Sequence, residues 1–193
     1  MPNVKGSVLR SRLDFVKGHF GDEGLSRLLA SLSEDDRSVL TDGLLPAQWY
    51  PFDLGERLDS GIMRTLGGGS ATTFRRLGAR SAEVNLAGVH QVFVHPGDPH
   101  ALLRRAPAIY KLYYDTGHRT YESLGPTSCR LVTHESESFS AADCETVIGW
   151  HERAVELCGG RNPRIEHPRC RARGAPVCEY VLSWDTGAAV RVS

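Results

Sequence analysis

The stretch of sequence that decides the fold runs from Cys158 to Trp184 and reads CGGRNPRIEHPRCRARGAPVCEYVLSW. Its last part alternates between apolar and polar residues, and side chains along a strand point to opposite faces with a period of two. The residues that would share one face are Cys178, Tyr180, Leu182 and Trp184. The pattern predicts a strand with one buried face near the C-terminus.

The same stretch holds three of the five cysteines of the chain. Zinc prefers four N, S or O ligands in a tetrahedron, and thiolates are favoured in structural sites. Cys158 ends a predicted helix, and the turn between Cys170 and Cys178 can bring those two sulfurs together. Glu166 or His167 would be the fourth ligand. Two other interpretations stay open from spacing: cysteines buried as small apolar residues, or a cross-strand disulfide.

Composition sets broad limits on the protein class. A chain of 193 residues suits one domain, or one domain with an appended helical segment, and we expect the two parts to form one compact unit. Lys and Arg number 23, and Asp and Glu also number 23, so no net charge attracts nucleic acid. No apolar run approaches the roughly 20 residues of a membrane span, and no secretory signal is recognised at the N-terminus. We therefore expect a cytoplasmic protein whose cysteines are free thiols, buried residues or metal ligands.

Helical periodicity dominates the first half of the chain. Apolar residues recur at steps of three and four, which is typical of amphipathic helices. The expected helices cover residues 8–20, 23–32, 51–66 and 71–86, with a third short helix after Ser33. A further helical pattern after the turn at 95–99 contains Pro107, where we expect a kink. Residues 1–90 are therefore predicted as a helical N-terminal segment.

The period changes in the second half of the chain. Residues 118–135 are predicted as two strands joined at Gly125 and Pro126. A helix is expected to begin at Ser140, which can cap it, and to end at Gly159. Two more strands are expected near 163–171 and 177–185. The predicted fold class is α+β, with N-terminal helices followed by a four-stranded, mainly antiparallel sheet in ββαββ order over residues 91–187, and a tail at 188–193.

Several motifs carry a resemblance to known families. The hairpin CRARGAPVCEYVLSW (170–184), preceded by Gly149-Trp150 in the expected helix, resembles the C-terminal part of the 4-vinyl reductase (V4R) domain. Over nearly its whole length, including WYPF, YYDTG and GWHERAVELCGG, the chain is similar to a stand-alone myxobacterial family of undetermined function. The V4R resemblance implies a fold shared with TRAPP-type trafficking subunits, dimerisation, and an apolar ligand cavity between sheet and helices.

The resemblance also implies a metal site. Phenol- and xylene-sensing transcriptional activators that carry the V4R domain hold zinc with three cysteines and a glutamate. Cys158, Cys170 and Cys178 match the three cysteine positions, whereas His167 stands at the glutamate position and Glu166 precedes it by one residue. The implied zinc ligands are therefore Cys158, His167, Cys170 and Cys178, with Glu166 as the alternative fourth ligand. The other two cysteines, Cys129 and Cys144, are expected to be indifferent to metal.

The function expected from these features is a non-enzymatic module that binds or senses a small molecule, with zinc in a structural role. The expected pocket residues are Tyr110, Tyr113, Tyr114, Phe139 and Trp150, because aromatic side chains line apolar ligand sites. No catalytic residue is predicted, because adjacent pairs such as His151-Glu152 point to different faces. The expected partners are an apolar or aromatic small molecule, a second copy of the chain in a homodimer, and a signalling protein. The alternatives are a scaffold dimer without a small ligand and a tetrapyrrole-related enzyme or carrier.

Overall fold

The computed structural model of the protein describes residues 1–66, 70–88 and 90–186, so the expected tail at 188–193 lies outside the described residues. Helices predominate up to Tyr113, and most of the strands follow after it. The elements are β1 (Asn3–Lys5), α1 (Gly6–Ala30), α2 (Glu34–Asp42), β2 (Trp49–Pro51), α3 (Phe52–Thr65), α4 (Ala71–Ala87), η1 (Gln91–Phe93), α5 (Pro99–Leu103), α6 (Ala106–Tyr113), β3 (His118–Gly125), β4 (Ser128–His134), α7 (Ala141–Leu157), β5 (Arg161–Arg169), η2 (Arg171–Arg173) and β6 (Cys178–Asp185).

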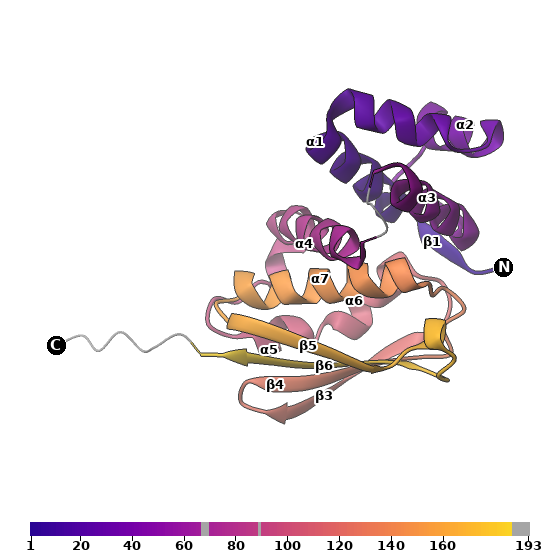
Figure 1. The fold of residues 1–193 in the computed structure, drawn as a ribbon. Helices are drawn as coiled ribbons and strands as arrows, with labels where there is room; N and C mark the ends of the chain where they lie inside the picture. The colour runs from indigo at the N-terminus through magenta and orange to yellow at the C-terminus, as the bar shows by residue number, and fades with distance from the viewer. Residues whose placement is uncertain (67–69, 89, 187–193) are drawn as a thin grey trace.

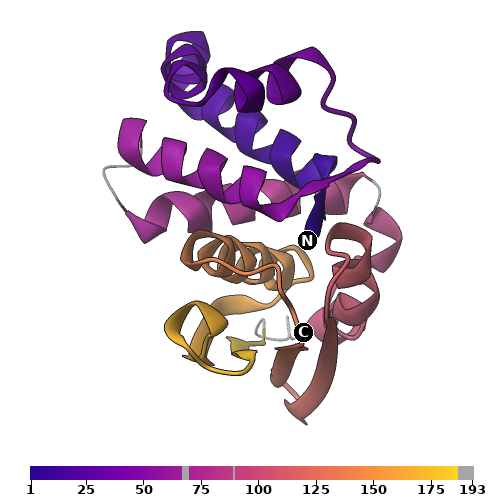
Figure 2. The same cartoon turned by 90° about the vertical axis from the view of Figure 1, so that its right-hand side faces the viewer.

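The elements form stacked layers. Figure 1 shows the sheet of β3, β4, β5 and β6 below α7, with α4 on the other side of α7 and the helices α1, α2 and α3 beyond it. The view in Figure 2, turned by 90°, shows α7 nearly end-on beneath α4. One apolar cluster fills the N-terminal helices, a second lies between the sheet and α7, and a third joins α4, α5 and α6 to α7. Helix α7 therefore lies at the centre of the fold.

The sheet is antiparallel throughout, with the strand order β3-β4-β6-β5. Leu131 of β4 is paired with Tyr180 of β6, and Cys129 with Leu182. These four residues are buried in the same apolar cluster as Ile148 of α7. Alternation of side chains along β4 and β6 thus gives the sheet its apolar face, and α7 covers that face.

Strand β5 returns along α7. A tight turn joins them, with Gly159 at φ +88°, a left-handed conformation that glycine adopts without steric cost. Helix α7 has 17 residues and spans about 26 Å, while β5 has 9 residues and spans about 30 Å. The far end of β5, next to Cys170, is therefore brought back to the beginning of α7.

The fold class expected from the sequence is corrected at its N-terminal end. The chain does not begin with helices, because β1 opens it and pairs with β2 in a separate two-stranded antiparallel sheet, with Val4 opposite Tyr50. Strands of three residues are too short to produce a detectable alternation. The sequence around Trp49 and Pro51 is instead typical of an aromatic corner that leads directly into a helix.

Two predicted helices also end differently. The kink expected at Pro107 is a helix boundary, because α5 ends at Leu103 and Pro107 lies in the first turn of α6. The helices expected at 8–20 and 23–32 both lie in α1, which Gly21 between them interrupts with φ +67°. In both cases the local signal is correct in position, and tertiary packing determines whether the helix stops or resumes there.

Helices α4 and α7 cross with their backbones in direct contact. A Cβ atom added to Gly78 of α4 would collide with the carbonyl oxygen of Thr146, and one added to Gly149 of α7 would collide with that of Arg75. The obstacles are backbone atoms, which cannot rotate away. The two glycines therefore set the distance between the helices.

We predict that Gly78→Ala lowers the free energy of unfolding by about 3 kcal/mol, because the added methyl group forces the two backbones apart. Gly18→Ala in α1 is the matched control, since nothing lies within 4 Å of its added Cβ. That variant is expected to be more stable than the wild type by about 0.5–1 kcal/mol through helix propensity. Urea denaturation of both variants would measure these effects, and equal stabilities would contradict the helix contact.

Candidate functional site

A mainly apolar cavity lies between the N-terminal helices and the layer of α7. Its volume is about 90 Å³, and α1, α4, α6, β3 and α7 all contribute to its wall. The lining residues include Val8, Ser81, Asn85, Ile109, Tyr110, Tyr113, Tyr114, Val147, Trp150 and His151. Apolar groups with a few polar atoms among them are typical of a small-molecule site.

Four of the five aromatic residues expected in a pocket lie around this cavity, namely Tyr110, Tyr113, Tyr114 and Trp150. Tyr110 and Tyr114 stack with ring centroids 4.9 Å apart. Phe139 does not line this cavity; it borders a smaller one of about 20 Å³ and lies under the guanidinium of Arg171. The structure therefore brings four of the expected residues together around one cavity, whereas Phe139 meets Tyr110 and Tyr114 only at the smaller one.

His151 supplies a hydrogen-bond acceptor at the cavity wall. Its Nδ1 lies 2.8 Å from the carbonyl oxygen of Val147, so Nδ1 carries the proton and donates it. Burial, with the nearby positive charge of Arg119, lowers the pKa of His151 to about 3, and the ring is therefore neutral. Nε2 keeps its lone pair and has no hydrogen-bond partner among the described residues. The sequence signal for the Nδ1 contact is local, because His151 follows Val147 by four residues on the apolar face of a predicted helix.

A buried ionic network forms one side of the cavity. Arg12 of α1 contacts Asp59 of α3 at 2.6 Å and Asp143 of α7 at 3.4 Å, and Tyr114 donates to Asp143 at 2.8 Å. Burial by itself would lower the pKa of Arg12, but the two carboxylates outweigh it and raise that pKa. Burial raises the pKa of Asp143. The network joins three helices and was not anticipated from the sequence, because its members lie 47 and 131 positions apart.

A second polar pair reaches the cavity through Tyr113. Nε2 of His90 is 2.7 Å from the hydroxyl of Tyr113, and burial raises the pKa of Tyr113 to about 12. The phenol is therefore neutral at physiological pH and can exchange hydrogen-bonding roles with the imidazole.

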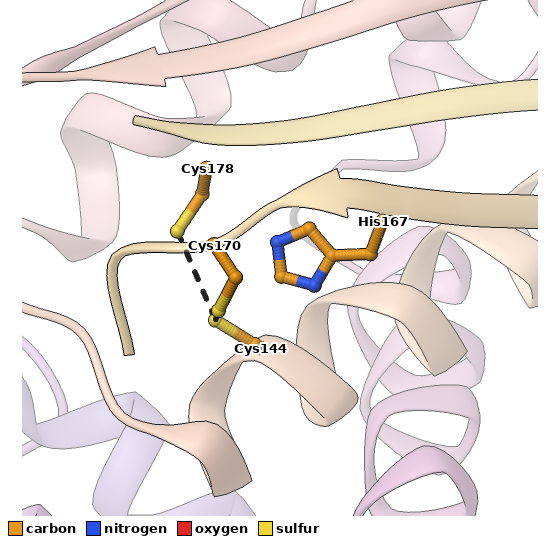
Figure 3. Close-up of side chains that lie close together, drawn as sticks. All are labelled: Cys144, His167, Cys170 and Cys178. Atoms are coloured by element: carbon orange, nitrogen blue, oxygen red, sulfur yellow. Dashed lines mark hydrogen bonds between the residues drawn. The ribbon is translucent and has the colours of Figure 1, made fainter. Parts of the chain in front are cut away.

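A cluster of thiols lies at the beginning of α7, away from the cavity. Cys144, His167, Cys170 and Cys178 each place a donor atom within 4.8 Å of the others, as Figure 3 shows. Sγ of Cys144 is 3.7 Å from that of Cys170 and 3.9 Å from that of Cys178. A hydrogen bond from the Cys144 thiol lowers the pKa of Cys178 and raises that of Cys144 itself. We refer to these four residues as the thiol cluster.

The set of metal ligands implied by the sequence is therefore wrong in its composition. Cys158 lies at the other end of α7, packed among apolar residues of α4 and α5. Cys144, expected to be indifferent to metal, takes its place because β5 runs back along the helix. Glu166 is exposed and next to His167 on a strand, so it points to the other face. Cys129 is buried in the sheet and is not part of the cluster.

A comparison with protein families matches residues 65–185, more than half of the chain, to one family model. Its description is "Protein of unknown function (DUF2378)". The chain belongs to this family. The resemblances suggested by the sequence, to the V4R domain and to a stand-alone myxobacterial family, are replaced by this DUF2378 assignment. A comparison with curated proteins finds no match.

Solved structures resemble the DUF2378 chain over nearly its whole length. An H-NOX protein from K. algicida, described as Fe(II) unliganded, has 12% sequence identity and a TM-score of 0.73, and the match covers 95% of this chain and 98% of that one. An H-NOX protein from S. oneidensis in the Fe(II)NO ligation state has 17% identity and a TM-score of 0.72, covering 94% and 99%. The fold is thus H-NOX-like, and the expected V4R/TRAPP-like fold is wrong.

The expected zinc cofactor is corrected by the same comparison. A third structure of this fold, with 10% identity, a TM-score of 0.72 and coverage of 94% and 95%, is described by its subject, heme distortion in the H-NOX family. The group associated with these neighbours is therefore heme iron and not zinc. At such identities the likeness establishes the fold alone.

The residues around the cavity do not fit a heme. Pockets that hold even drug-sized ligands measure roughly 300–1,000 Å³, whereas this cavity measures about 90 Å³. The stacked rings of Tyr110 and Tyr114 and the Arg12 network fill the space beside it. His151 offers an imidazole nitrogen of the kind that holds heme iron, but the space for a macrocycle is missing.

None of the helices that the structure describes is long and apolar enough to cross a membrane.

We predict that Arg12→Ala lowers the free energy of unfolding by about 3–5 kcal/mol, because Asp59 and Asp143 would remain buried without their cation. Arg80→Ala is the control, since Arg80 pairs with Glu83 on the surface, where such pairs contribute about 0.5 kcal/mol or less. Chemical denaturation at neutral pH would measure both. Similar small losses would show that the buried network is dispensable.

The burial of His151 predicts a dependence of stability on pH. The unfolded histidine has a pKa near 6.5 and the folded one about 3. Between these values only the unfolded chain binds the proton, so each pH unit of acidification lowers stability by about 1.4 kcal/mol, and above pH ~6.5 the effect is absent. The stability of the wild type relative to His151→Gln should therefore fall by about 2 kcal/mol between pH ~6.5 and ~5. Urea unfolding across this range tests it, and a pH-independent difference would contradict a buried neutral imidazole.

Proposed function

We propose that this DUF2378 chain is a non-enzymatic sensor module whose ligand occupies the cavity between the N-terminal helices and α7. The observation that carries the proposal is the free acceptor of His151 in a mainly apolar enclosure. Nε2 of His151 is not one of the fully buried atoms that lack a partner among the described residues, so water can reach it from the cavity. A ligand that displaces such a water keeps its affinity only if its own donor replaces the hydrogen bond. The ligand is therefore a small neutral molecule, largely apolar, with one hydrogen-bond donor.

The size of the cavity sets the size of the ligand. An engineered cavity of roughly 150 Å³ in another protein is known to bind benzene. The present cavity of about 90 Å³ suits a smaller molecule, such as a five-membered ring. Aromatic side chains, including Tyr113 and Trp150, favour a flat apolar partner.

The position of the cavity supports a sensing role. Its wall combines α1 with α6 and α7, so a bound ligand contacts both the N-terminal helices and the layer that rests on the sheet. Arg12 and Tyr114 belong both to the wall and to the buried ionic network. A ligand can therefore alter how α1 packs on α7. A ligand changes a conformation only if it contacts the two states differently, and a site between these helices meets that condition. H-NOX structures with and without NO on Fe(II) are a fold-level analogy for a small-ligand site.

The test uses pyrrole and furan, two five-membered rings of similar size that differ in a donor N–H group. Pyrrole is expected to raise the melting temperature of the wild type, with a gain of about 2.7 kcal/mol at 100 times its Kd. In His151→Phe, pyrrole affinity should fall about 3- to 10-fold, because one uncharged hydrogen bond contributes about 0.5–1.5 kcal/mol. Furan affinity should be nearly the same in both proteins. Calorimetric titration would give all four constants.

The outcomes separate the alternatives. If neither ring binds the wild type, the ligand site is wrong and the fold serves as a scaffold. If pyrrole and furan respond equally to His151→Phe, the cavity binds by shape alone and the acceptor has no role. Stoichiometric uptake of hemin, seen as a Soret band that His151→Phe shifts, would show that the cavity opens for a macrocycle and would overturn the size argument.

A further inference from the structure

The thiol cluster is built from three separate parts of the chain. Cys144 lies in the first turn of α7, His167 lies near the end of β5, and Cys170 and Cys178 flank the η2 loop before β6. Four donors in a tetrahedron around one ion, with metal–sulfur bonds of about 2.3 Å, place neighbouring sulfurs about 3.8 Å apart. The separations found, 3.7 and 3.9 Å, match that value. A disulfide would require about 2.05 Å, and one disulfide would use only two of the three sulfurs.

A second observation points to an ion at the same place. Nε2 of His167 is buried and has no hydrogen-bond partner in the described part of the chain. The ring is held in position by stacking on Tyr180, with centroids 4.3 Å apart and an angle of 15° between the planes. Figure 3 shows the imidazole directed from β5 toward the sulfurs. An orphaned nitrogen among three thiols is accounted for by a metal ion and not by apolar packing.

The surroundings suit thiolate ligands. The backbone N–H of Arg171 donates to Sγ of Cys178 at 3.4 Å, and the guanidinium of Arg173 donates to the carbonyl oxygen of His167. Such donors offset the negative charge that three thiolates bring to one ion. A groove of about 600 Å³ is lined in part by Cys144, His167 and Cys170, which gives an ion a path from solvent.

We propose that Cys144, His167, Cys170 and Cys178 bind one thiophilic transition-metal ion in tetrahedral S₃N coordination. Soft thiolates with one imidazole select this class of ion over calcium or magnesium. Four protein ligands leave no open position, so the role is structural. The ion cross-links the first turn of α7 to the β5–β6 hairpin. Asp143 directly precedes Cys144 in the chain. The ion therefore also holds in place the carboxylate of Asp143, which belongs to the Arg12 network.

The experiment titrates the purified, reduced, metal-free full chain with Co(II), whose absorption reports thiolate ligation and tetrahedral geometry. The wild type is expected to bind one Co(II), with thiolate-to-cobalt charge-transfer bands and intense tetrahedral d–d bands. Cys144→Ser should weaken binding by more than the roughly 10–100-fold that loss of a residue merely supporting a ligand causes. Cys158→Ser, at the far end of α7, and Cys129→Ser, in the sheet, are matched buried controls and should bind as the wild type does.

His167→Gln provides a second variant, because His167 is only partly buried and its loss leaves the core intact. It should retain the charge-transfer bands and shift the d–d bands, since the three thiolates remain. Absence of Co(II) binding by the wild type would overturn the proposal, and so would equal binding by Cys144→Ser and Cys158→Ser. Elemental analysis of the protein as expressed then identifies the native ion. The pyrrole test reads out His151 and the Co(II) titration reads out the thiol cluster, so failure of one proposal is distinguishable from failure of the other.

Discussion

The backbone contact between α4 and α7 is the constraint on which the rest of the structure depends. Gly78 and Gly149 allow the two helices to approach until main-chain atoms touch. That approach places α7 between the sheet on one side and the N-terminal helices on the other (Figure 1). A central helix covered on both sides buries much of its surface, and the polar residues on its buried faces need specific partners.

His151 and Asp143 are two such residues of α7, and they differ in how they are satisfied. Asp143 receives hydrogen bonds from Tyr114 and Arg12, so its charge is neutralised within the protein. His151 is satisfied at Nδ1 by its own helix and keeps an acceptor at Nε2. The charge of Asp143 is already paired, whereas neutral His151 keeps a free acceptor. The cavity therefore disfavours ions and favours a small molecule that donates a hydrogen bond.

The cavity and the thiol cluster are connected through the first turn of α7. Asp143 is bonded to Arg12 and Tyr114, two residues of the cavity wall, and Cys144 belongs to the cluster. Consecutive residues on a helix point about 100° apart, so a single turn serves both sides of the helix. The first turn of α7 is therefore in contact with both the Arg12 network and the thiol cluster. The H-NOX-like fold supplies this arrangement without a heme-sized space in this chain.

By itself the sequence determined the local features of this protein. Ser140 accepts a hydrogen bond from the N–H of Asp143 and begins α7, and Gly159 ends it with a left-handed conformation, because these signals act over a few residues. The period-two pattern of 178–185 likewise gives β6. Only the tertiary structure decided which groups meet. Cys144 and Cys158 share a helix face but lie about 21 Å apart along it, and only the return of β5 selects Cys144. The Arg12 network arises from contacts distant in sequence, which no local pattern records. The tautomer of His151 is set by its own helix, but the cavity that its Nε2 faces is formed by helices distant in sequence.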